Sequence, residues 1–333
     1  MAPTDDSPQP APSDSGPPSN GGNGSKIVSG SFGDPEPDDR VRSFAEYELI
    51  EEIAFNGMSR VYKALDKRLG RVVAIQIMRV GHLTTETDVR QFLVGARATM
   101  SLRHPNIVAI HEVGEHEGHP YISMDYVMGP DLAQIARGNP LPATRAAGYV
   151  LKIAEAVEYA HQHGMLHRDL KPGNVLIDER DQPRLTGFTL AKPLDVTDGT
   201  MTTVTLLGTP AYMSPEQARG EQHLVGRASD IYSLGVVLYE FVTGRRPFQA
   251  DSLPKLLTQV LEAVPESPRR FNPTVARDVE AICLKCLEKE PDRRYSSAGA
   301  LAEDLDRFLR KEPILAQPVG RIEKAWRWLR SKP

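Results

Sequence analysis

Two kinds of pattern divide the chain, and their order limits the folds that it can adopt. Between residues 47 and 78, short runs of β-branched and aromatic residues are typical of linked strands. From residue 143 onward, apolar residues recur three and four positions apart, which indicates helices at about 143–163, 228–244, 275–288 and 296–310. This order predicts an α+β fold with a small β-rich lobe, a larger helical lobe and a ligand site between them.

The β-rich part is predicted to contain one long helix as well as strands. Three linked strands are expected at 47–50, 61–64 and 72–77, and a later strand at 121–127. The helix is expected at about 85–102, ending before the segment His104-Pro105-Asn106. We therefore place the N-lobe at about 44–126 and the C-lobe at about 127–312, within one domain spanning 44–312.

The two ends of the chain differ from the domain in composition. Residues 1–43 are rich in Pro, Ser, Gly and Asp, with almost no large apolar side chain, so we predict a disordered tail. Residues 313–333 alternate basic side chains with Trp326 and Trp328, which suits either a membrane surface or a helix packed on the C-lobe. No secretory signal or membrane span is evident, which predicts a cytoplasmic protein, with contact at the inner face of the membrane as an option.

Charge and metal-binding residue types exclude some functions. The chain has 44 acidic and 40 basic residues, and a net charge of -4 gives no general attraction to nucleic acid. Cys283 and Cys286 lie on an expected helix without further ligands nearby, so we interpret them as buried apolar residues rather than zinc ligands. His111, His116 and His119 lie beside glycines, which favours a turn between two strands over a metal site.

One motif is specific enough to identify a family. Residues 167–174 read His-Arg-Asp-Leu-Lys-Pro-Gly-Asn, and residues 208–216 read Gly-Thr-Pro-Ala-Tyr-Met-Ser-Pro-Glu. With Asp230 and Arg294 further on, the chain resembles the Ser/Thr protein kinases over about 47–310, and residues 312–328 resemble the juxtamembrane region of bacterial receptor-type members. The resemblance implies the bilobal protein kinase fold.

The resemblance also implies roles for retained residues. Asp169 would accept the proton of the substrate hydroxyl, Asn174 would hold magnesium, and Lys171 with Thr209 would shape the Ser/Thr acceptor site. Glu216 would pair with Arg294, and Asp230 would bind the backbone of the catalytic loop. Arg168 would pair with a phosphate on the activation segment, for which the candidates include Thr203 and Thr205.

The sequence departs from the family where phosphate and metal are handled. The three positions of the glycine-rich turn carry Ala54, Asn56 and Ser59. Gln76 replaces the lysine that contacts the phosphates, and Gly95 replaces its glutamate partner on the helix. Gly187 replaces the aspartate that binds magnesium, which leaves Asn174 as a weak metal ligand by itself; Phe188 is retained and is expected to fill an apolar slot between the lobes.

The adenine-binding side of the site is retained by the same comparison. The family's apolar walls and hinge correspond to Val61, Ala74, Met124, Asp125, Val127 and Leu176. Weak nucleotide binding that needs no metal therefore stays open, whereas magnesium binding is not expected.

These residues predict a pseudokinase that acts as a scaffold or allosteric regulator in Ser/Thr phosphorylation signalling. The alternative is a Ser/Thr kinase of low activity that transfers phosphate from ATP with Asp169 as base. Protein partners are expected, such as an active kinase or its substrate, and the segment 313–333 adds the option of contact with a membrane surface.

Overall fold

The computed structural model describes residues 42–55, 59–78, 86–188, 192–193 and 210–316. The predictions for the N-terminal tail and for the Trp-containing segment lie almost wholly outside these ranges. Among the described residues, no helix has the length and apolar character needed to cross a bilayer.

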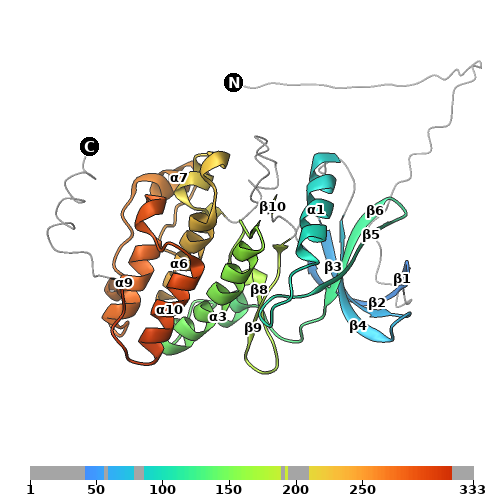
Figure 1. Cartoon of the computed structure of the whole chain (residues 1–333), viewed down its shortest axis with the longest axis horizontal. Helices are drawn as coiled ribbons and strands as arrows, with labels where there is room; N and C mark the ends of the chain where they lie inside the picture. The colour runs from blue at the N-terminus through green and yellow to red at the C-terminus, as the bar shows by residue number, and fades with distance from the viewer. Residues whose placement is uncertain (1–41, 56–58, 79–85, 189–191, 194–209, 317–333) are drawn as a thin grey trace, which may run out of the picture. The chain divides into compact units, whose positions relative to one another are not determined.

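The N-lobe is built on one antiparallel sheet of six strands (Figure 1). Its spatial order is β1-β2-β3-β4-β6-β5. The strands are β1 (Arg42–Phe44), β2 (Tyr47–Phe55), β3 (Ser59–Asp66), β4 (Arg71–Met78), β5 (Ile110–His116) and β6 (His119–Asp125). The predicted strand at 47–50 is the first part of β2. The predicted strands at 61–64 and 72–77 lie within β3 and β4, which extend beyond them at both ends.

Alternation along β4 gives the sheet two apolar faces. Val73 and Ile75 pack on one face with Tyr47, while Ala74 and Met78 pack on the other with residues of helix α1 (Glu86–Thr99). This is the period of two that places successive side chains on opposite faces of a strand. Gln76 has the same parity as Ala74 and Met78, so its side chain belongs to the face that α1 covers.

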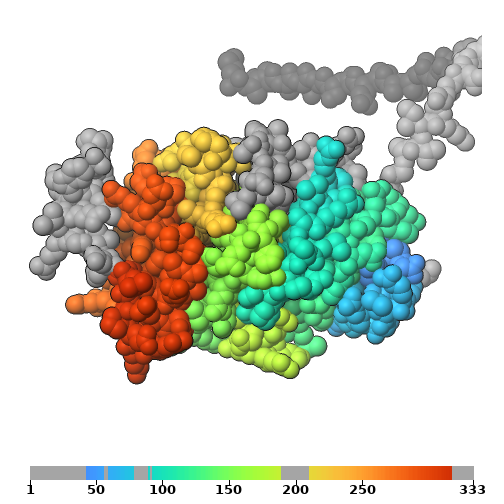
Figure 2. Space-filling model, viewed as in Figure 1, coloured from blue at the N-terminus to red at the C-terminus, as the bar shows by residue number. Residues whose placement is uncertain are grey.

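The C-lobe is helical, as the sequence predicts (Figure 1). The four predicted helices correspond to α3 (Ala143–Gln162), α6 (Arg227–Thr243), α9 (Arg277–Cys286) and α10 (Ala298–Leu309). The other described helices of this lobe are α2 (Leu132–Ile135), α5 (Pro215–Ala218), α7 (Leu253–Glu262) and α8 (Pro268–Phe271), with short 3-10 turns at 172–174, 210–212, 222–224 and 291–293. Figure 2 shows the orange and red surface of the last helices on the opposite side of the domain from the blue strands.

Two further pairs of short antiparallel strands follow α3. Strand β8 (Val175–Ile177) pairs with β9 (Pro183–Leu185), and β7 (Met165–Leu166) pairs with β10 (Lys192–Pro193). The lobes are joined here by backbone hydrogen bonds, in which Val108 N donates to Leu185 O at 2.9 Å and Leu185 N donates to Asn106 O at 2.8 Å. Strand β9, which follows the loop 167–174 and precedes Gly187, is therefore tied to residues 106–108.

The cysteines and the histidine cluster have structural roles in the described part of the chain. Cys283 and Cys286 are fully buried free thiols of α9, as the helical pattern predicts, and Cys283 Sγ donates to Gly235 O at 3.5 Å. His116 and His119 flank the turn between β5 and β6, and His111 Nε2 lies 2.8 Å from a carboxylate oxygen of Asp125. The predicted turn between two strands is confirmed.

The contact between α6 and α9 depends on one glycine. A Cβ atom on Gly235 would lie 2.4 Å from Cys286 Cβ, so the two helices approach more closely than an alanine would allow. We expect Gly235→Ala to reduce the free energy of unfolding by about 1–3 kcal/mol, since overpacking a dense core forces backbone shifts. Chemical denaturation measures the change.

Gly148 provides a matched control for this prediction. It also lies inside a long helix, α3, but a Cβ atom there would meet nothing within 4 Å. Gly148→Ala is therefore expected to raise stability by up to about 1 kcal/mol through helix propensity. Equal effects of the two substitutions would contradict the packing argument.

Candidate functional site

The loop 167–174 is held by a buried carboxylate of α6. Asp230 accepts hydrogen bonds from the backbone N of His167 at 2.9 Å and of Arg168 at 2.8 Å, and its Oδ2 lies 2.8 Å from His161 Nε2. Burial favours a higher pKa for Asp230, but the hydrogen bonds and the two histidines bring its pKa below the ordinary value. Arg168 has a φ of 67°, and the contact of Asp230 with its backbone stabilises this left-handed conformation.

Three of the predicted catalytic residues come together in this loop. Lys171 Nζ lies 2.7 Å from Asp169 Oδ2. Asn174 Nδ2 donates to the Asp169 backbone oxygen at 2.7 Å and to Asp169 Oδ2 at 3.0 Å. The Asp169 carboxylate is thus oriented by two side chains. Thr209, Thr203 and Thr205 lie outside the described residues. Arg168 is described, and its buried Nε has no hydrogen-bond partner among the residues that the structure describes.

The position expected to bind magnesium is a glycine in a left-handed conformation. Gly187 has a φ of 90°, and a Cβ atom there would lie 2.9 Å from Asn174 Nδ2. The following residue, Phe188, is 3% exposed, and its ring centroid lies 4.6 Å from that of His167. Phe188 therefore fills a buried apolar position as predicted, while Gly187 offers no metal ligand from a side chain.

Two of the substituted residues of the N-lobe bond to each other. Gln76 Nε2 on β4 donates to Ser59 Oγ on β3 at 2.7 Å, and Ser59 is 3% exposed. Ser59 is opposite Met78 in the register and Val61 is opposite Gln76, so the two side chains are diagonal neighbours on the face that α1 covers. The sequence identified each residue as a substitution but did not predict this hydrogen bond. An antiparallel register for the hairpin of β3 and β4 would have placed the two side chains on the same face.

The other substituted positions are dispersed. Gly95 is buried within α1, and its backbone oxygen accepts a hydrogen bond from Thr99 Oγ1 at 2.8 Å. Ala54 is exposed on β2, opposite Val61. Asn56 lies outside the described residues.

The two lysines nearest in sequence, Lys63 and Lys67, contact groups other than the catalytic loop. Lys63 Nζ lies 3.4 Å from Glu51 Oε1 and 5.1 Å from the ring centroid of Tyr126. Lys67 Nζ donates to Ser43 Oγ at 3.1 Å. Neither contact involves Asp169, Asn174 or Gln76.

The predicted adenine walls of the N-lobe lie in one apolar cluster. Ala74 on β4 is opposite Met124 on β6, and both are buried. Val61 and Val127 pack against the same cluster. Asp125 N donates to Ala109 O at 3.0 Å, so this amide is committed within the sheet. Leu176 comes from the C-lobe, where it pairs with Arg184 between β8 and β9.

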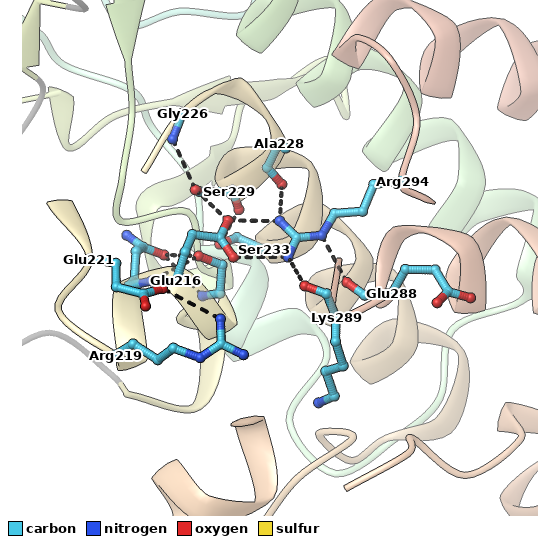
Figure 3. A network of polar contacts seen from close by, with 12 residues as sticks. Glu216, Arg219, Glu221, Gly226, Ala228, Ser229, Ser233, Glu288, Lys289 and Arg294 are labelled. Atoms are coloured by element: carbon cyan, nitrogen blue, oxygen red, sulfur yellow. Dashed lines mark hydrogen bonds and ion pairs between the residues drawn. The ribbon is translucent and has the colours of Figure 1, made fainter. Parts of the chain in front are cut away.

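A second buried network supports the segment that follows residue 210. Arg294 donates to both carboxylate oxygens of Glu216 at 2.8 and 2.9 Å, the ion pair expected from the sequence (Figure 3). Burial favours a higher pKa for Glu216, but the guanidinium of Arg294 and the hydroxyl of Ser229 bring it below its ordinary value. Ser229 Oγ donates to Glu216 Oε1 at 2.6 Å and was not predicted to take part.

Lys289 lies beside this network and predicts a dependence of stability on pH. Its Nζ donates to the backbone oxygens of Val260 and Gln259 at the end of α7, at 2.5 and 3.4 Å. Burial, together with the positive charge of Arg294, lowers the pKa of Lys289 from 10.5 to about 7. Between those values the unfolded chain binds more protons than the folded one, so stability rises with pH and falls as the pH drops toward 7.

Thermal unfolding at several pH values between 6.5 and 10 measures this slope. We expect Lys289→Met to make it shallower, since the titrating amine is removed. Lys255→Met, on the exposed side of α7, serves as the control and should leave the slope unchanged. Identical slopes in wild type and Lys289→Met would contradict the assignment.

The architecture and the loop 167–174 together define a class of protein. A six-stranded antiparallel lobe with one long helix, joined to a helical lobe that presents an Asp169-Lys171-Asn174 cluster, is the protein kinase fold. A family model described as the protein kinase domain matches residues 47–305. The chain belongs to the protein kinase family.

Relatives and a solved structure agree with this assignment. Serine/threonine-protein kinase PrkC of Bacillus subtilis is 40% identical over 265 residues, which cover 79% of this chain and 40% of PrkC. Serine/threonine-protein kinase PknB of Mycobacterium tuberculosis is 37% identical over 279 residues, covering 82% of this chain and 44% of PknB. The chain thus spans less than half the length of these relatives. The kinase domain of PknI from Mycobacterium tuberculosis superposes with a TM-score of 0.64 at 25% identity, covering 80% of this chain and 98% of that domain.

Proposed function

We propose that this chain is a pseudokinase, which acts as a scaffold or allosteric regulator in Ser/Thr phosphorylation signalling. The observation that carries the proposal is the hydrogen bond between Gln76 and Ser59. These residues replace a lysine and a glycine of the phosphate site, and they satisfy each other instead of presenting a cation and a free backbone to a phosphate.

The donors at the metal end support the same proposal. Family members bind magnesium and ATP, and magnesium requires an octahedral set of oxygen ligands. Gly187 has no side chain, so the side chains of Asn174 and Asp169 offer one amide oxygen and one carboxylate. That carboxylate already accepts hydrogen bonds from Lys171 and Asn174. This donor set does not fit a magnesium-triphosphate complex.

The expected cost to catalysis is large. Phosphoryl transfer depends on positioning and charge neutralisation, for which the family uses a Lys–Glu pair and a metal-bound aspartate. Loss of one preorganised electrostatic group costs about 10²–10³ in rate. Gln76, Gly95 and Gly187 remove three such groups, and although their effects do not add, turnover by the remaining residues is expected to be negligible.

An assay of phosphate incorporation tests the proposal. Purified chain is incubated with labelled ATP, magnesium and a generic Ser/Thr substrate protein, in parallel with Asp169→Ala. We expect equal, background incorporation in both. Incorporation by the wild type that disappears in Asp169→Ala would overturn the proposal.

A Ser/Thr kinase of low activity is the second candidate, and a specific observation favours it. Asp169 is oriented by Lys171 and Asn174 as a general base would be, and the relatives named above are Ser/Thr kinases. In that case Asp169 would accept the proton of the acceptor hydroxyl. The same assay separates the two candidates.

The expected partners are proteins, such as an active kinase or its substrate. The proposed location is the cytoplasm, with contact at the inner face of the membrane through residues 313–333. The basic segment 313–333 with its two tryptophans suits anionic lipid. Binding to phosphatidylserine vesicles that is lost on replacement of Trp326 and Trp328 would support a membrane contact. Equal binding of both forms would count against it.

A further inference from the structure

A buried carboxylate of α10 holds the segment that follows this helix. Asp304 has 0% of its surface exposed, and its two oxygens accept hydrogen bonds from neutral groups. Leu315 N donates to Oδ1 at 2.6 Å, Ala316 N donates to Oδ2 at 2.8 Å, and the hydroxyl of Tyr295 donates to Oδ2 at 2.8 Å. Burying a carboxylate is costly without such donors, so the segment that supplies two of them is bound firmly to α10.

Packing anchors the same segment. Ile314 packs against the core of the C-lobe, and Ala316 is 3% exposed within that core. Leu315, between them, is 61% exposed and is held outward by its two anchored neighbours. The point from which the chain continues after Ala316 is therefore fixed relative to α10.

The described charges beside this segment nearly cancel. Arg310 pairs with Asp306 at 2.8 Å, and the exposed Lys311 is followed by the exposed Glu312. Attraction to an anionic surface must therefore come from residues 317–333, where one acidic residue, Glu323, is outnumbered by five basic ones, Arg321, Lys324, Arg327, Arg330 and Lys332. Basic residues of this kind bind anionic headgroups, and tryptophan favours the membrane interface.

The basic residues begin close to the anchored segment. Arg321 comes five residues after Ala316, and five residues span at most about 18 Å. A lipid surface that binds Arg321 therefore lies near the α10 side of the C-lobe. The N-lobe strands are on the opposite side of the domain (Figure 2).

We propose that this domain meets an anionic lipid surface with the side of the C-lobe formed by α10 and residues 313–316, and that Asp304 is the positioning residue that fixes this orientation. The inference rests on the proposed membrane contact of residues 313–333 and extends it from a segment to a face of the folded domain. The N-lobe then points away from the lipid.

Energy transfer to labelled lipid headgroups tests the orientation. A fluorophore is attached to the full chain through Glu303→Cys on the exposed side of α10, or through Leu69→Cys at the exposed turn between β3 and β4. Cys283 and Cys286 are fully buried and do not compete for the label. On phosphatidylserine vesicles we expect stronger transfer from residue 303 than from residue 69, and loss of binding on phosphatidylcholine vesicles.

The possible failures are distinguishable. Binding to phosphatidylserine with equal transfer from the two sites would overturn this inference alone. Absence of binding, as expected if residues 317–333 pack on the C-lobe instead, would overturn both this inference and the proposed membrane contact. The pseudokinase proposal fails on a separate result, the Asp169-dependent incorporation of phosphate.

Asp304→Asn tests the role of the buried carboxylate. Asparagine keeps the shape but replaces one acceptor oxygen with a donor, so at least one of the three hydrogen bonds is lost. We expect hydrogen exchange of residues 314–316 to accelerate by at least about tenfold while the domain stays folded by circular dichroism. On vesicles, binding should persist and the difference between labels at residues 303 and 69 should disappear.

Glu303→Gln, with the label attached through Lys311→Cys instead, is the control on the same helix. Glu303 is exposed, so its replacement is expected to leave exchange and orientation unchanged. An Asp304→Asn protein that keeps the difference between the two labels would overturn the role of Asp304. If this variant does not fold, the comparison of residues 303 and 69 with Asp304 in place still decides whether the α10 side faces the lipid.

Discussion

Replacing Arg294 by methionine is expected to lower the free energy of unfolding by about 3–5 kcal/mol, since it leaves a buried carboxylate without its partner. Arg294 is 4% exposed and Glu216 is 1% exposed. The guanidinium also donates to the backbone oxygens of Ala228, Glu288 and Lys289, so its loss removes three further hydrogen bonds (Figure 3). Denaturant titration followed by circular dichroism measures the loss.

The adjacent arginine offers a matched control. Arg293 is exposed in the same short turn, so Arg293→Met is expected to change stability by less than about 0.5 kcal/mol. A double-mutant cycle with Glu216→Gln isolates the pair, and we expect a coupling energy of about 1–3 kcal/mol. Additive effects of Glu216→Gln and Arg294→Met would show that the ion pair is not the cause of the loss.

The framework of the C-lobe was predictable because its signals are local. Helices α3, α9 and α10 follow from apolar residues at helical spacing, and the Glu216–Arg294 pair follows from the family resemblance. Helix α7 was not predicted. Its sequence nevertheless carries helix signals, because Leu253, Leu256, Leu257, Val260 and Leu261 recur at helical spacing and Pro254 is in the first turn.

The state of the site was less predictable, since it depends on contacts between distant segments. The sequence shows that Gln76 and Ser59 replace family residues, but not that they bond, because the register of β3 against β4 and the rotamers decide this. Similarly, the sequence shows that residue 187 is glycine. It does not show that φ there is 90°, or that an added Cβ atom would lie 2.9 Å from Asn174 Nδ2. These two facts determine what a restored side chain would meet.

The three substitutions Gln76→Lys, Gly95→Glu and Gly187→Asp, made together, are expected to create magnesium-dependent ATP binding that the wild type does not show. Each single change should fail for its own reason. Gly95 is buried in α1, so a glutamate there without a lysine at residue 76 is an unpaired buried charge. We therefore expect Gly95→Glu to be destabilising alone and less so when combined with Gln76→Lys.

Gly187→Asp meets a different obstacle. Its Cβ atom would crowd Asn174 Nδ2, which is held by two hydrogen bonds to Asp169, and φ at residue 187 is left-handed. Aspartate tolerates this conformation better than alanine does, and both variants add the same Cβ atom, so we expect Gly187→Asp to reduce stability no more than Gly187→Ala does. Thermal unfolding compares the two variants at residue 187 directly.

Phosphate incorporation provides the decisive measurement on the restored protein. If the three groups restore charge neutralisation, incorporation should exceed the wild-type background by at least about 10²-fold and vanish when Asp169→Ala is added. A restored protein that unfolds cooperatively, and so is folded, yet binds no magnesium-ATP would show that residues 76, 95 and 187 are not where the chemistry was lost. Magnesium-ATP binding by the wild type would contradict the same conclusion from the other side, because the chain would then hold phosphate with Gln76 and Gly187 in place.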